Sequence, residues 1–341
     1  MNIEYNMKKI LLVLVFLLCI NVNASIVVMD ADSGRILYSK NKNERKLIAS
    51  TTKIMTTIVA LENANLSDVL KVGNEIKTVN GSMIYVKENE KFTLNDLLHG
   101  LMLQSGNDAA MVIASKTMPY DNFIASMNLK AHKLGMDNTT FENPHGLNDN
   151  TKNYSTAEDM SKLMRYAIKN KDFINITSTK TYKVGNYIWY NKNKLLSEYK
   201  YLISGKIGYT KASGQVFVSA AKKDNKTLII ASIDESDKFN LHKNLYERYF
   251  KEYERYKIID KNTFSFKVKN KNHDHYFIKN DFYMLLTKEE IKKLKISIDL
   301  QKNNNFVNIY LNNNLIHSEK LYILKYKSRL KKVKELLLFW K

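Results

Sequence analysis

Two stretches of the chain have the alternation of apolar and polar residues that is typical of β-strands. The first, SIVVMDADSGRILYSKN at residues 25 to 41, has apolar runs on both sides of Asp32-Ser33-Gly34. Apolar runs that flank such a turn sequence predict a β-hairpin. The second begins at Gly205, where KIGYT, QVFVSAAKKD and KTLIIASID follow one another and KDNK supplies a tight turn. Both stretches are therefore expected in a layer of strands.

Between these strands the spacing of the apolar residues becomes helical. Ile54, Ile58 and Leu61 recur at helical intervals, and LNDLLHGLML and DAAMVIASKTM predict two helices separated by residues 105–107. Residues 155–158, Ser-Thr-Ala-Glu, form a capping-box pattern that opens a further helix, EDMSKLMRYAIKN. We therefore expect a mixed α/β (α+β) domain over residues 25–256, in which an antiparallel sheet frames a helical cluster.

The pattern changes again near the C-terminus. NLYERYFKEYERY, at residues 244–256, predicts a helix that closes the first domain. After residue 257 the chain has short apolar segments, TFSFKV, NNNFVNIYL and NNLIH, separated by Asn-rich turns. These segments predict a small all-β domain over residues 257–325.

The last stretch, residues 326–341, has the pattern of an amphipathic helix. The lysines of this stretch lie around the rest of the helix. Five residues share one helical face, namely Tyr326, Leu330, Val333, Leu337 and Trp340. A helix with this pattern lies in a membrane interface, with its lysines toward an anionic membrane surface. The alternative is a helix that packs on its own domain.

The first 24 residues have the pattern of a secretory signal peptide. Lys8 and Lys9 precede the apolar run ILLVLVFLLCI, and small residues follow up to a cleavage site after Ala24. An uncleaved anchor is the alternative, but eleven apolar residues are short for a span that needs about 20. Cleavage would also remove Cys19, the single cysteine, so no thiol or disulfide chemistry is expected in the mature chain.

The chain is strongly basic, with 54 Lys and Arg against 34 Asp and Glu and a net charge of +20 over 341 residues. This charge favours acidic partners, although a chain rich in Lys and Asn throughout would also produce it by composition alone. Export makes nucleic acid an unexpected partner. Anionic lipid and acidic polymers remain.

Three short motifs offer chemistry. Ser50 and Lys53 are three residues apart in a predicted helix, which places a hydroxyl and its base on one face. Ser50 as a simple helix cap is the alternative. Residues 105–107, Ser-Gly-Asn, place polar groups between apolar helices, and residues 206–208, Lys-Ile-Gly, place a cation and a close-approach glycine on a strand. An interhelical turn and a surface lysine are the corresponding alternatives.

In this order, S-x-x-K, S-x-N and K-x-G resemble the signature of the serine penicillin-recognising enzymes. The surrounding segments extend the match: IASTTKIMT, DLLHGLMLQSGNDAA, KLGMDNTTFENPHGLND, YSTAEDM and GKIGYTKASG. Over about residues 25–235 the chain resembles the D-alanyl-D-alanine carboxypeptidases, which are low-molecular-mass penicillin-binding proteins. The resemblance implies a catalytic domain with the fold shared by β-lactamases and penicillin-binding proteins.

The resemblance also implies a function. A serine peptidase of this family removes the terminal D-alanine from peptidoglycan stem peptides that end in D-Ala-D-Ala, and β-lactam antibiotics are its covalent inhibitors. It needs no metal and no cofactor. Such a protein is exported and acts in the periplasm or at the extracytoplasmic face of the cell membrane, where the amphipathic tail would anchor it peripherally.

The family's catalytic roles transfer to matching positions. Ser50 would attack the penultimate D-alanine, and Lys53 would be its base, with a pKa lowered by burial beside Lys206. Ser105 would relay a proton to the leaving D-alanine, and Asn107 would orient the acyl side of the substrate.

The binding roles transfer in the same way. The backbone N–H groups of Ser50 and Tyr209 would form the oxyanion hole, which the positive end of the helix dipole would assist. Lys206 and Thr210 would bind the terminal carboxylate, and Gly208 would let the substrate lie close to the strand.

Two residues need separate interpretation. The family has Thr where this chain has Ile207, and the lost hydroxyl predicts reduced but not absent activity. His145, in ENPHGLND, invites a role as general base, but the turn chemistry around it predicts a structural loop.

Other functions stay open on the sequence. A DD-endopeptidase would cut cross-links with the same serine chemistry, and Ile207 would also fit a catalytically degenerate protein that binds the cell wall or acts as a scaffold. A β-lactamase is disfavoured, because the glutamate that commonly speeds deacylation has no evident counterpart.

Overall fold

The computed structural model describes residues 23–267, 275–301 and 305–324. Contacts divide the chain into two units, Met1–Phe250 and Lys251–Lys341, which are described separately below. The predicted tail helix and all but Asn23 and Ala24 of the predicted signal peptide lie outside the described residues. In the described ranges no helix is both long and apolar enough to cross a membrane.

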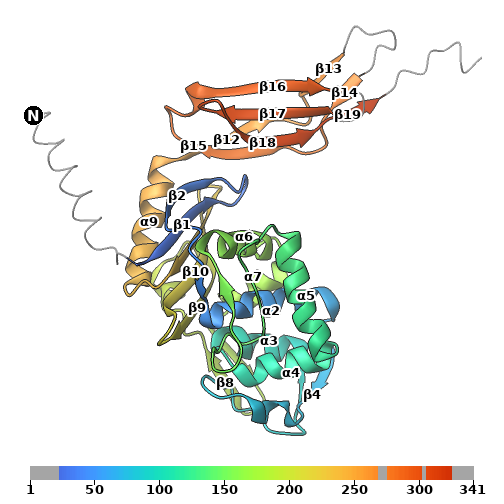
Figure 1. Cartoon of the computed structure of the whole chain (residues 1–341), viewed down its shortest axis with the longest axis vertical. Helices are drawn as coiled ribbons and strands as arrows, with labels where there is room; N and C mark the ends of the chain where they lie inside the picture. Colours follow the sequence, from blue (N-terminus) through green and yellow to red (C-terminus); the bar gives the residue numbers. More distant parts are fainter. Residues whose placement is uncertain (1–22, 268–274, 302–304, 325–341) are drawn as a thin grey trace, which may run out of the picture. The chain divides into compact units, whose positions relative to one another are not determined.

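The first unit is built on a five-stranded antiparallel sheet (Figure 1). Its order is β2-β1-β11-β10-β9, so the N-terminal hairpin pairs with the last of three strands that come far later in the chain. The strand bounds are Ser25–Asp30 (β1), Ile36–Lys40 (β2), Leu202–Thr210 (β9), Gly214–Lys223 (β10) and Lys226–Ile233 (β11). The predicted hairpin and the predicted later strands are confirmed. Strand β9, which contains the K-x-G motif, forms one edge of the sheet.

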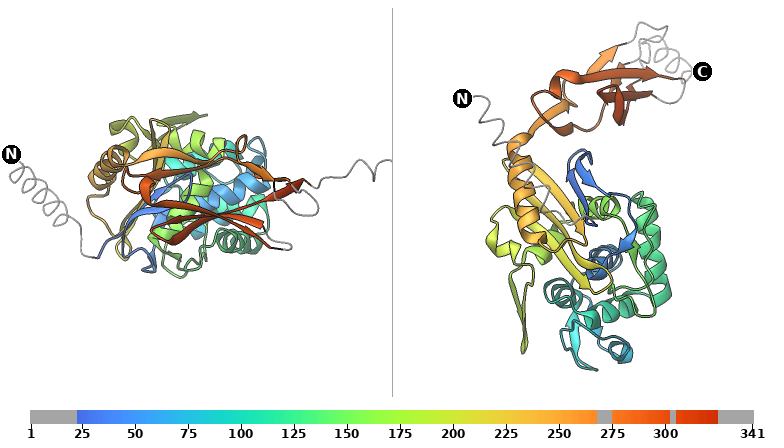
Figure 2. Two further views of the ribbon diagram at one scale, coloured as in Figure 1. Left: turned by 90° about the horizontal axis from the view of Figure 1, so that it is seen from above. Right: turned by 60° about the vertical axis from the view of Figure 1, so that its left-hand side comes forward.

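Helices cover both faces of this sheet, and Figure 2 shows α9 on one side and the helical cluster on the other. The main helices of the cluster are α2 (Lys53–Asn63), α3 (Leu94–Leu103), α4 (Asn107–Thr117), α5 (Tyr120–Lys133), α6 (Ala157–Ala167) and α7 (Lys171–Ser178). Val216, Val218 and Ala220 of β10 are fully buried in one apolar core with these helices. Phe217 lies on the opposite face and stacks on His242 of α9 (Lys238–Glu252). Successive side chains of β10 therefore point alternately to the helical cluster and to α9, so this one strand contributes to the core on both faces of the sheet.

Short elements complete the first unit. They are the strand pairs β3 (Lys46–Leu47) with β6 (Tyr154–Ser155), β4 (Val69–Lys71) with β5 (Lys91–Thr93) and β7 (Thr181–Val184) with β8 (Tyr187–Tyr190), the 3₁₀ helices η1 (Ala49–Thr52) and η2 (Asn74–Thr78), and helix α8 (Leu195–Glu198).

Two predicted helix boundaries are wrong. Helix α6 spans Ala157–Ala167, and its N-cap is Thr156 and not Ser155 as the capping box predicted, because the Thr156 hydroxyl accepts from the Asp159 N–H. The Ser155 hydroxyl is buried and bonds to Thr139 instead. Helix α9 spans Lys238–Glu252 and not 244–256, because residues from Glu254 onward pair with another strand.

The second unit contains short antiparallel strands. Its sheets are β12-β15, β13-β14-β19 and β16-β17-β18. The bounds are Glu254–Ile259 (β12), Ser265–Lys267 (β13), His275–Phe277 (β14), Phe282–Leu286 (β15), Leu294–Leu300 (β16), Asn305–Leu311 (β17), Asn314–Lys320 (β18) and Tyr322–Leu324 (β19), with a 3₁₀ turn, η3, at Ile291–Lys293. Met284, Val307 and Ile309 are fully buried in its own apolar core.

Candidate active site

Ser50 lies in a strained turn directly before helix α2. The turn is the 3₁₀ helix η1, and α2 begins at Lys53. Ala49 has φ +45°, a left-handed conformation that a residue with a Cβ rarely adopts. The alternative that Ser50 is a simple helix cap is wrong, because the N-cap is Thr52 and no side chain caps α2. Ser50 is therefore free of a capping role and lies next to a helix N-terminus.

Lys53 reaches back to Ser50 within one turn. Its Nζ lies 3.0 Å from Ser50 Oγ, as the spacing of three residues predicted. The same nitrogen lies 2.7 Å from Asn107 Oδ1 and 2.7 Å from the carbonyl oxygen of His145. A neutral amine has two hydrogens and one lone pair. When both hydrogens go to these two acceptors, the lone pair is left for the hydroxyl of Ser50.

The surroundings of Lys53 favour this neutral form. Its side chain is fully buried, and burial is the main reason that its pKa lies well below the ordinary value. The nearby charge of Lys206 lowers the pKa further, while Asp108 opposes the shift. The predicted direction of the shift, with burial and Lys206 as its causes, is confirmed.

Ser105 and Lys206 form a second hydroxyl–amine pair. Lys206 Nζ donates to Ser105 Oγ at 3.0 Å and to the carbonyl oxygen of Ile207 at 3.0 Å. Ser105 has φ +65°, so the break between α3 and α4 turns sharply at this residue. Burial, followed by the charge of Lys192, lowers the pKa of Lys206 to about 7. Near neutral pH both the charged and the neutral form of this lysine are therefore populated.

Asn107 joins the two halves of the site. Besides accepting from Lys53, its side-chain nitrogen donates to the carbonyl oxygen of Asn80 at 2.5 Å. Asn107 is the first residue of α4 and is almost fully buried. Its carboxamide is thus fixed in one orientation between the loop at Asn80 and the Lys53 amine.

Gly208 brings strand β9 against the turn that contains Ser50. A Cβ built on Gly208 would lie 2.9 Å from the backbone nitrogen of Ser50 and 3.1 Å from that of Thr51. Any larger residue would therefore crowd the backbone amide of the serine. Next along β9, Tyr209 is exposed, and the Thr210 hydroxyl contacts Ser213 Oγ at 2.9 Å. The structure thus places the third motif beside the first two.

No signal in the sequence marks the part of the His145 loop that contacts the site. The His145 carbonyl oxygen accepts from Lys53, while its ring accepts from the Leu147 N–H at 3.1 Å. Burial, followed by the charge of Lys53, lowers the pKa of His145 to about 3, so the ring is neutral near pH 7. Gly146, with φ +92°, lies so close that a Cβ would be 1.9 Å from the Ala49 carbonyl oxygen. An Asn-Pro-His-Gly turn in sequence does not reveal which segment its backbone will contact.

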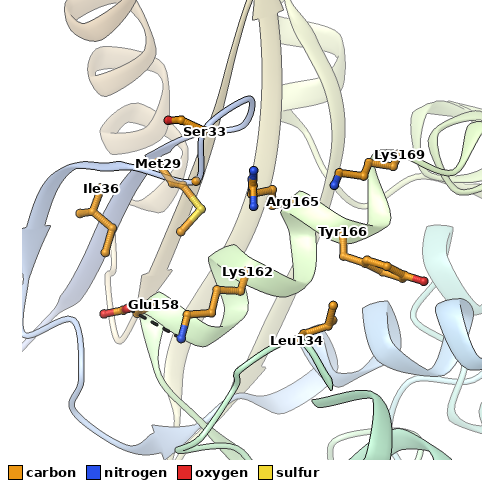
Figure 3. Close-up of a pocket in the computed structure, with 10 residues that line it drawn as sticks. Met29, Ser33, Ile36, Leu134, Glu158, Lys162, Arg165, Tyr166 and Lys169 are labelled. Atoms are coloured by element: carbon orange, nitrogen blue, oxygen red, sulfur yellow. Dashed lines mark ion pairs between the residues drawn. The ribbon is translucent and has the colours of Figure 1, made fainter. Parts of the chain in front are cut away.

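A separate cavity of about 330 Å³ lies between the first hairpin and α6 (Figure 3). None of the predicted site residues lines it. Lys162 is paired with Asp159 at 3.1 Å and with Glu158 at 3.7 Å, and Arg165 donates to backbone carbonyl oxygens. The charges of these two residues that line the cavity are therefore already paired with protein oxygens. Among the described residues, no cluster of His, Cys, Asp or Glu is suited to hold a metal ion.

Comparison with known families gives the site its context. The family model described as D-alanyl-D-alanine carboxypeptidase, peptidase S11, matches residues 20–237, which include all three motifs. This chain belongs to that family. The remaining comparisons agree with the assignment and extend over most of the chain.

Several D-alanyl-D-alanine carboxypeptidases are similar in sequence. DacF of Bacillus subtilis is 31% identical over 299 residues, which cover 82% of this chain and 76% of DacF. DacB2 of Mycobacterium tuberculosis is 34% identical over 210 residues, which cover 60% of this chain and 72% of DacB2. The chain is therefore similar to D-alanyl-D-alanine carboxypeptidases from both of these bacteria.

Solved structures give the same fold. The crystal structure of a D-alanyl-D-alanine carboxypeptidase from Mycobacterium tuberculosis has a TM-score of 0.63 at 30% identity and covers 67% of this chain and 90% of its own. Penicillin-binding protein 5 from Haemophilus influenzae has a TM-score of 0.77 at 24% identity and covers 88% and 96%, which shows the fold alone. The predicted fold, that of the penicillin-binding proteins, is confirmed.

Proposed function

We propose that this protein is a serine-type D-Ala-D-Ala carboxypeptidase that removes the terminal D-alanine from peptidoglycan stem peptides through an acyl-enzyme on Ser50. Family membership supports the reaction. One observation supports the assignment to this serine: the buried Lys53 amine lies 3.0 Å from Ser50 Oγ while two other oxygens take its hydrogens. The amine is thus oriented to remove the hydroxyl proton.

In the acylation step Ser50 Oγ attacks the carbonyl carbon of the penultimate D-alanine, and its proton passes to Lys53. The backbone N–H groups of Ser50 and Tyr209 hold the oxyanion that forms, in the space that Gly208 leaves open. Ser105, held by Lys206, relays the proton that Lys53 has taken to the nitrogen of the leaving D-alanine, so Lys53 is neutral again and Ser105 keeps its hydroxyl. The C–N bond breaks and the acyl-enzyme remains.

Lys206 and Thr210 bind the terminal carboxylate of the substrate, and Asn107 orients its acyl side. After D-alanine has left, water attacks the ester of the acyl-enzyme and returns the hydroxyl to Ser50. A β-lactam would acylate the same serine. No step uses a metal ion or a cofactor.

The test is the release of D-alanine from purified muropeptides. The mature protein should convert a pentapeptide that ends in D-Ala-D-Ala to the tetrapeptide, as mass spectrometry would show. Ser50→Ala should abolish the conversion, and Ser197→Ala, which changes an exposed serine on α8, should leave it unchanged. If Ser50→Ala keeps its activity, another residue is the nucleophile.

The same assay separates the alternatives, which the comparisons do not favour. A cross-linked dimer should remain intact if the protein is a carboxypeptidase and should be cut to monomers if it is an endopeptidase. A catalytically degenerate protein would leave both substrates unchanged. Conversion of the monomer with the dimer intact is the result that the proposal requires.

We also propose that residues 1–24 direct export, that the first unit, predicted as 25–256, is the catalytic domain, that the second, predicted as 257–325, is the small β domain, and that residues 326–341 bind an anionic membrane surface. The sequence patterns support this, namely an apolar run after two lysines and an apolar face ringed by lysines. Truncation after Tyr326 should release the protein from membranes into the soluble fraction. Continued sedimentation of the truncated protein with membranes would disprove the role of the tail.

A further inference from the structure

A second cavity, of about 280 Å³, lies in the first unit, and no residue of the three motifs lines it. Two loops form most of its wall, namely residues 78–80 at the end of η2 and residues 143–151. Met111 of α4 and Tyr120, the first residue of α5, complete it. Sites for small molecules begin at about 300 Å³. This cavity therefore has room for one long side chain of a ligand.

The two loops meet beside the catalytic residue Asn107. Asn80 lines the cavity, and its carbonyl oxygen accepts from the Asn107 side chain at 2.5 Å. A Cβ built on Gly81 would lie 3.1 Å from the same side-chain nitrogen and 3.7 Å from Leu147, which lines the cavity from the other loop. In the proposed function Asn107 orients the acyl side of the substrate. The cavity thus adjoins the place where that side of the peptide lies.

Asp149 is the one charged group among the described residues that line this cavity. It is exposed, and its carboxylate makes no hydrogen bond or ion pair within the part of the chain that the structure describes. The His145 ring, with a pKa of about 3, is neutral near pH 7. Val79 and Met111 add apolar surface to the lining. The cavity therefore suits an alkyl chain that ends in a cation.

The proposed substrate carries such a chain on its acyl side. The residue that precedes D-Ala-D-Ala in a stem peptide is a diamino acid, and its side-chain amine is the group on which a cross-link forms. Before cross-linking this amine is free and positively charged. After cross-linking it is a neutral amide.

We propose that this cavity is a subsite for the side chain of the diamino acid and that Asp149 pairs with its free amine. The inference rests on the proposed function and names the substrate of the same site more closely, as stem peptides whose side-chain amine is not cross-linked. Because Asp149 is exposed, its effect should be that of a partly solvated ion pair and should weaken as the salt concentration rises.

The test compares two peptides that differ in one charge. N-α-acetyl-L-lysyl-D-alanyl-D-alanine has a free side-chain amine, and in the diacetyl peptide this amine is blocked. Asp149→Asn should lower kcat/KM for the free-amine peptide about three- to fivefold and should leave the diacetyl peptide unchanged. Asp149→Glu keeps the charge and should stay close to the wild type with both peptides. Asp149→Lys should raise kcat/KM for a peptide whose side-chain amine is succinylated, because that chain ends in a carboxylate.

Asp137→Asn is the matched control. Asp137 is also exposed but does not line the cavity, so this variant should leave both peptides unchanged. An equal loss with both peptides in Asp149→Asn would show that the residue acts through the structure of its loop. No loss with either peptide would show that it does not bind the amine. Either result overturns the inference.

A second measurement needs no peptide hydrolysis. In a penicillin the acyl chain takes the place of the peptide on the acyl side. A penicillin with a 6-aminohexanoyl chain, which ends in an ammonium group, is compared with its N-acetylated form by following the acyl-enzyme with mass spectrometry. Asp149→Asn should slow acylation by the first about threefold and should not slow acylation by the second.

This comparison separates the inference from the proposed function. If the wild type is acylated by penicillin but hydrolyses no D-Ala-D-Ala peptide, the proposed function fails, while the two penicillins still decide the role of Asp149. Equal effects of Asp149→Asn on both penicillins, or no effect on either, contradict that role. A wild-type protein that is neither acylated nor active overturns both.

Discussion

Replacing Lys206 with methionine should change how the stability of the first unit depends on pH. The folded protein holds this buried amine at a pKa of about 7, whereas the unfolded chain has the ordinary value of 10.5. Between these two values the unfolded state binds more protons than the folded state, so the free energy of unfolding rises with pH. Each pH unit contributes up to about 1.4 kcal/mol. From pH 7 to pH 9 Lys206 should therefore add about 2 kcal/mol in the wild type.

Lys206→Met removes this titration, so its gain in unfolding free energy over the same range should be smaller by about 2 kcal/mol. Urea unfolding at both pH values, followed by the fluorescence of the buried Trp189, measures the difference. Lys53 remains in both proteins. The exposed variant Lys194→Met should keep the wild-type gain. An unchanged gain in Lys206→Met would refute the argument that burial has depressed the pKa of this lysine.

Three further substitutions test the packing and chemistry of the site. Gly208→Ala, whose methyl group would lie 2.9 Å from the Ser50 nitrogen, should slow penicillin acylation at least about tenfold because it crowds an oxyanion amide; an unchanged rate would contradict this. Gly146→Ala would overlap the Ala49 carbonyl at a positive φ, so calorimetry should show a Tm lower by about 5 °C or more, and an unchanged Tm would show that the loop can move. Ile207→Thr should raise kcat/KM for the D-Ala-D-Ala substrate by up to about tenfold, whereas no gain would show that the hydroxyl is dispensable.

The elements that depend on local pattern could be predicted from the sequence. Alternation of apolar residues placed β1, β2, β10 and β11 within a residue or so of their observed bounds, and helical spacing placed α3 and α4 on either side of residues 105–107. The approach of Ser50 and Lys53 followed from their separation of three residues. These features depend on neighbours along the chain, which the sequence lists directly.

Features that depend on distant segments could not be predicted from pattern alone. The predicted helix at 244–256 is wrong at its end because pairing with β15 draws residues from Glu254 into a strand. The turn at Ala49, which has a positive φ, packs its carbonyl against the distant loop at Gly146. In the same way, the His145 carbonyl that accepts from Lys53 is 92 residues away, and nothing local marks it.

The position of Lys192 illustrates the same limit. Its neighbours in sequence show an ordinary polar connection between a strand and a short helix. Only the hydrogen bond of its backbone to Leu103 and the packing of Asn193 against Gly205 bring this segment to the site, where the charge of Lys192 helps to lower the pKa of Lys206 and Lys53. A single lysine in a chain with 54 Lys and Arg carries no signal of its own.

The central claim is that Ser50 is the nucleophile, and intact-protein mass spectrometry after incubation with penicillin tests it most directly. The account predicts one penicilloyl group per chain, which peptide mapping places on Ser50 and which Ser50→Ala does not form. Ser197→Ala should still form the adduct. The absence of any adduct at high drug concentration and long times, or an adduct on another residue, would contradict the account.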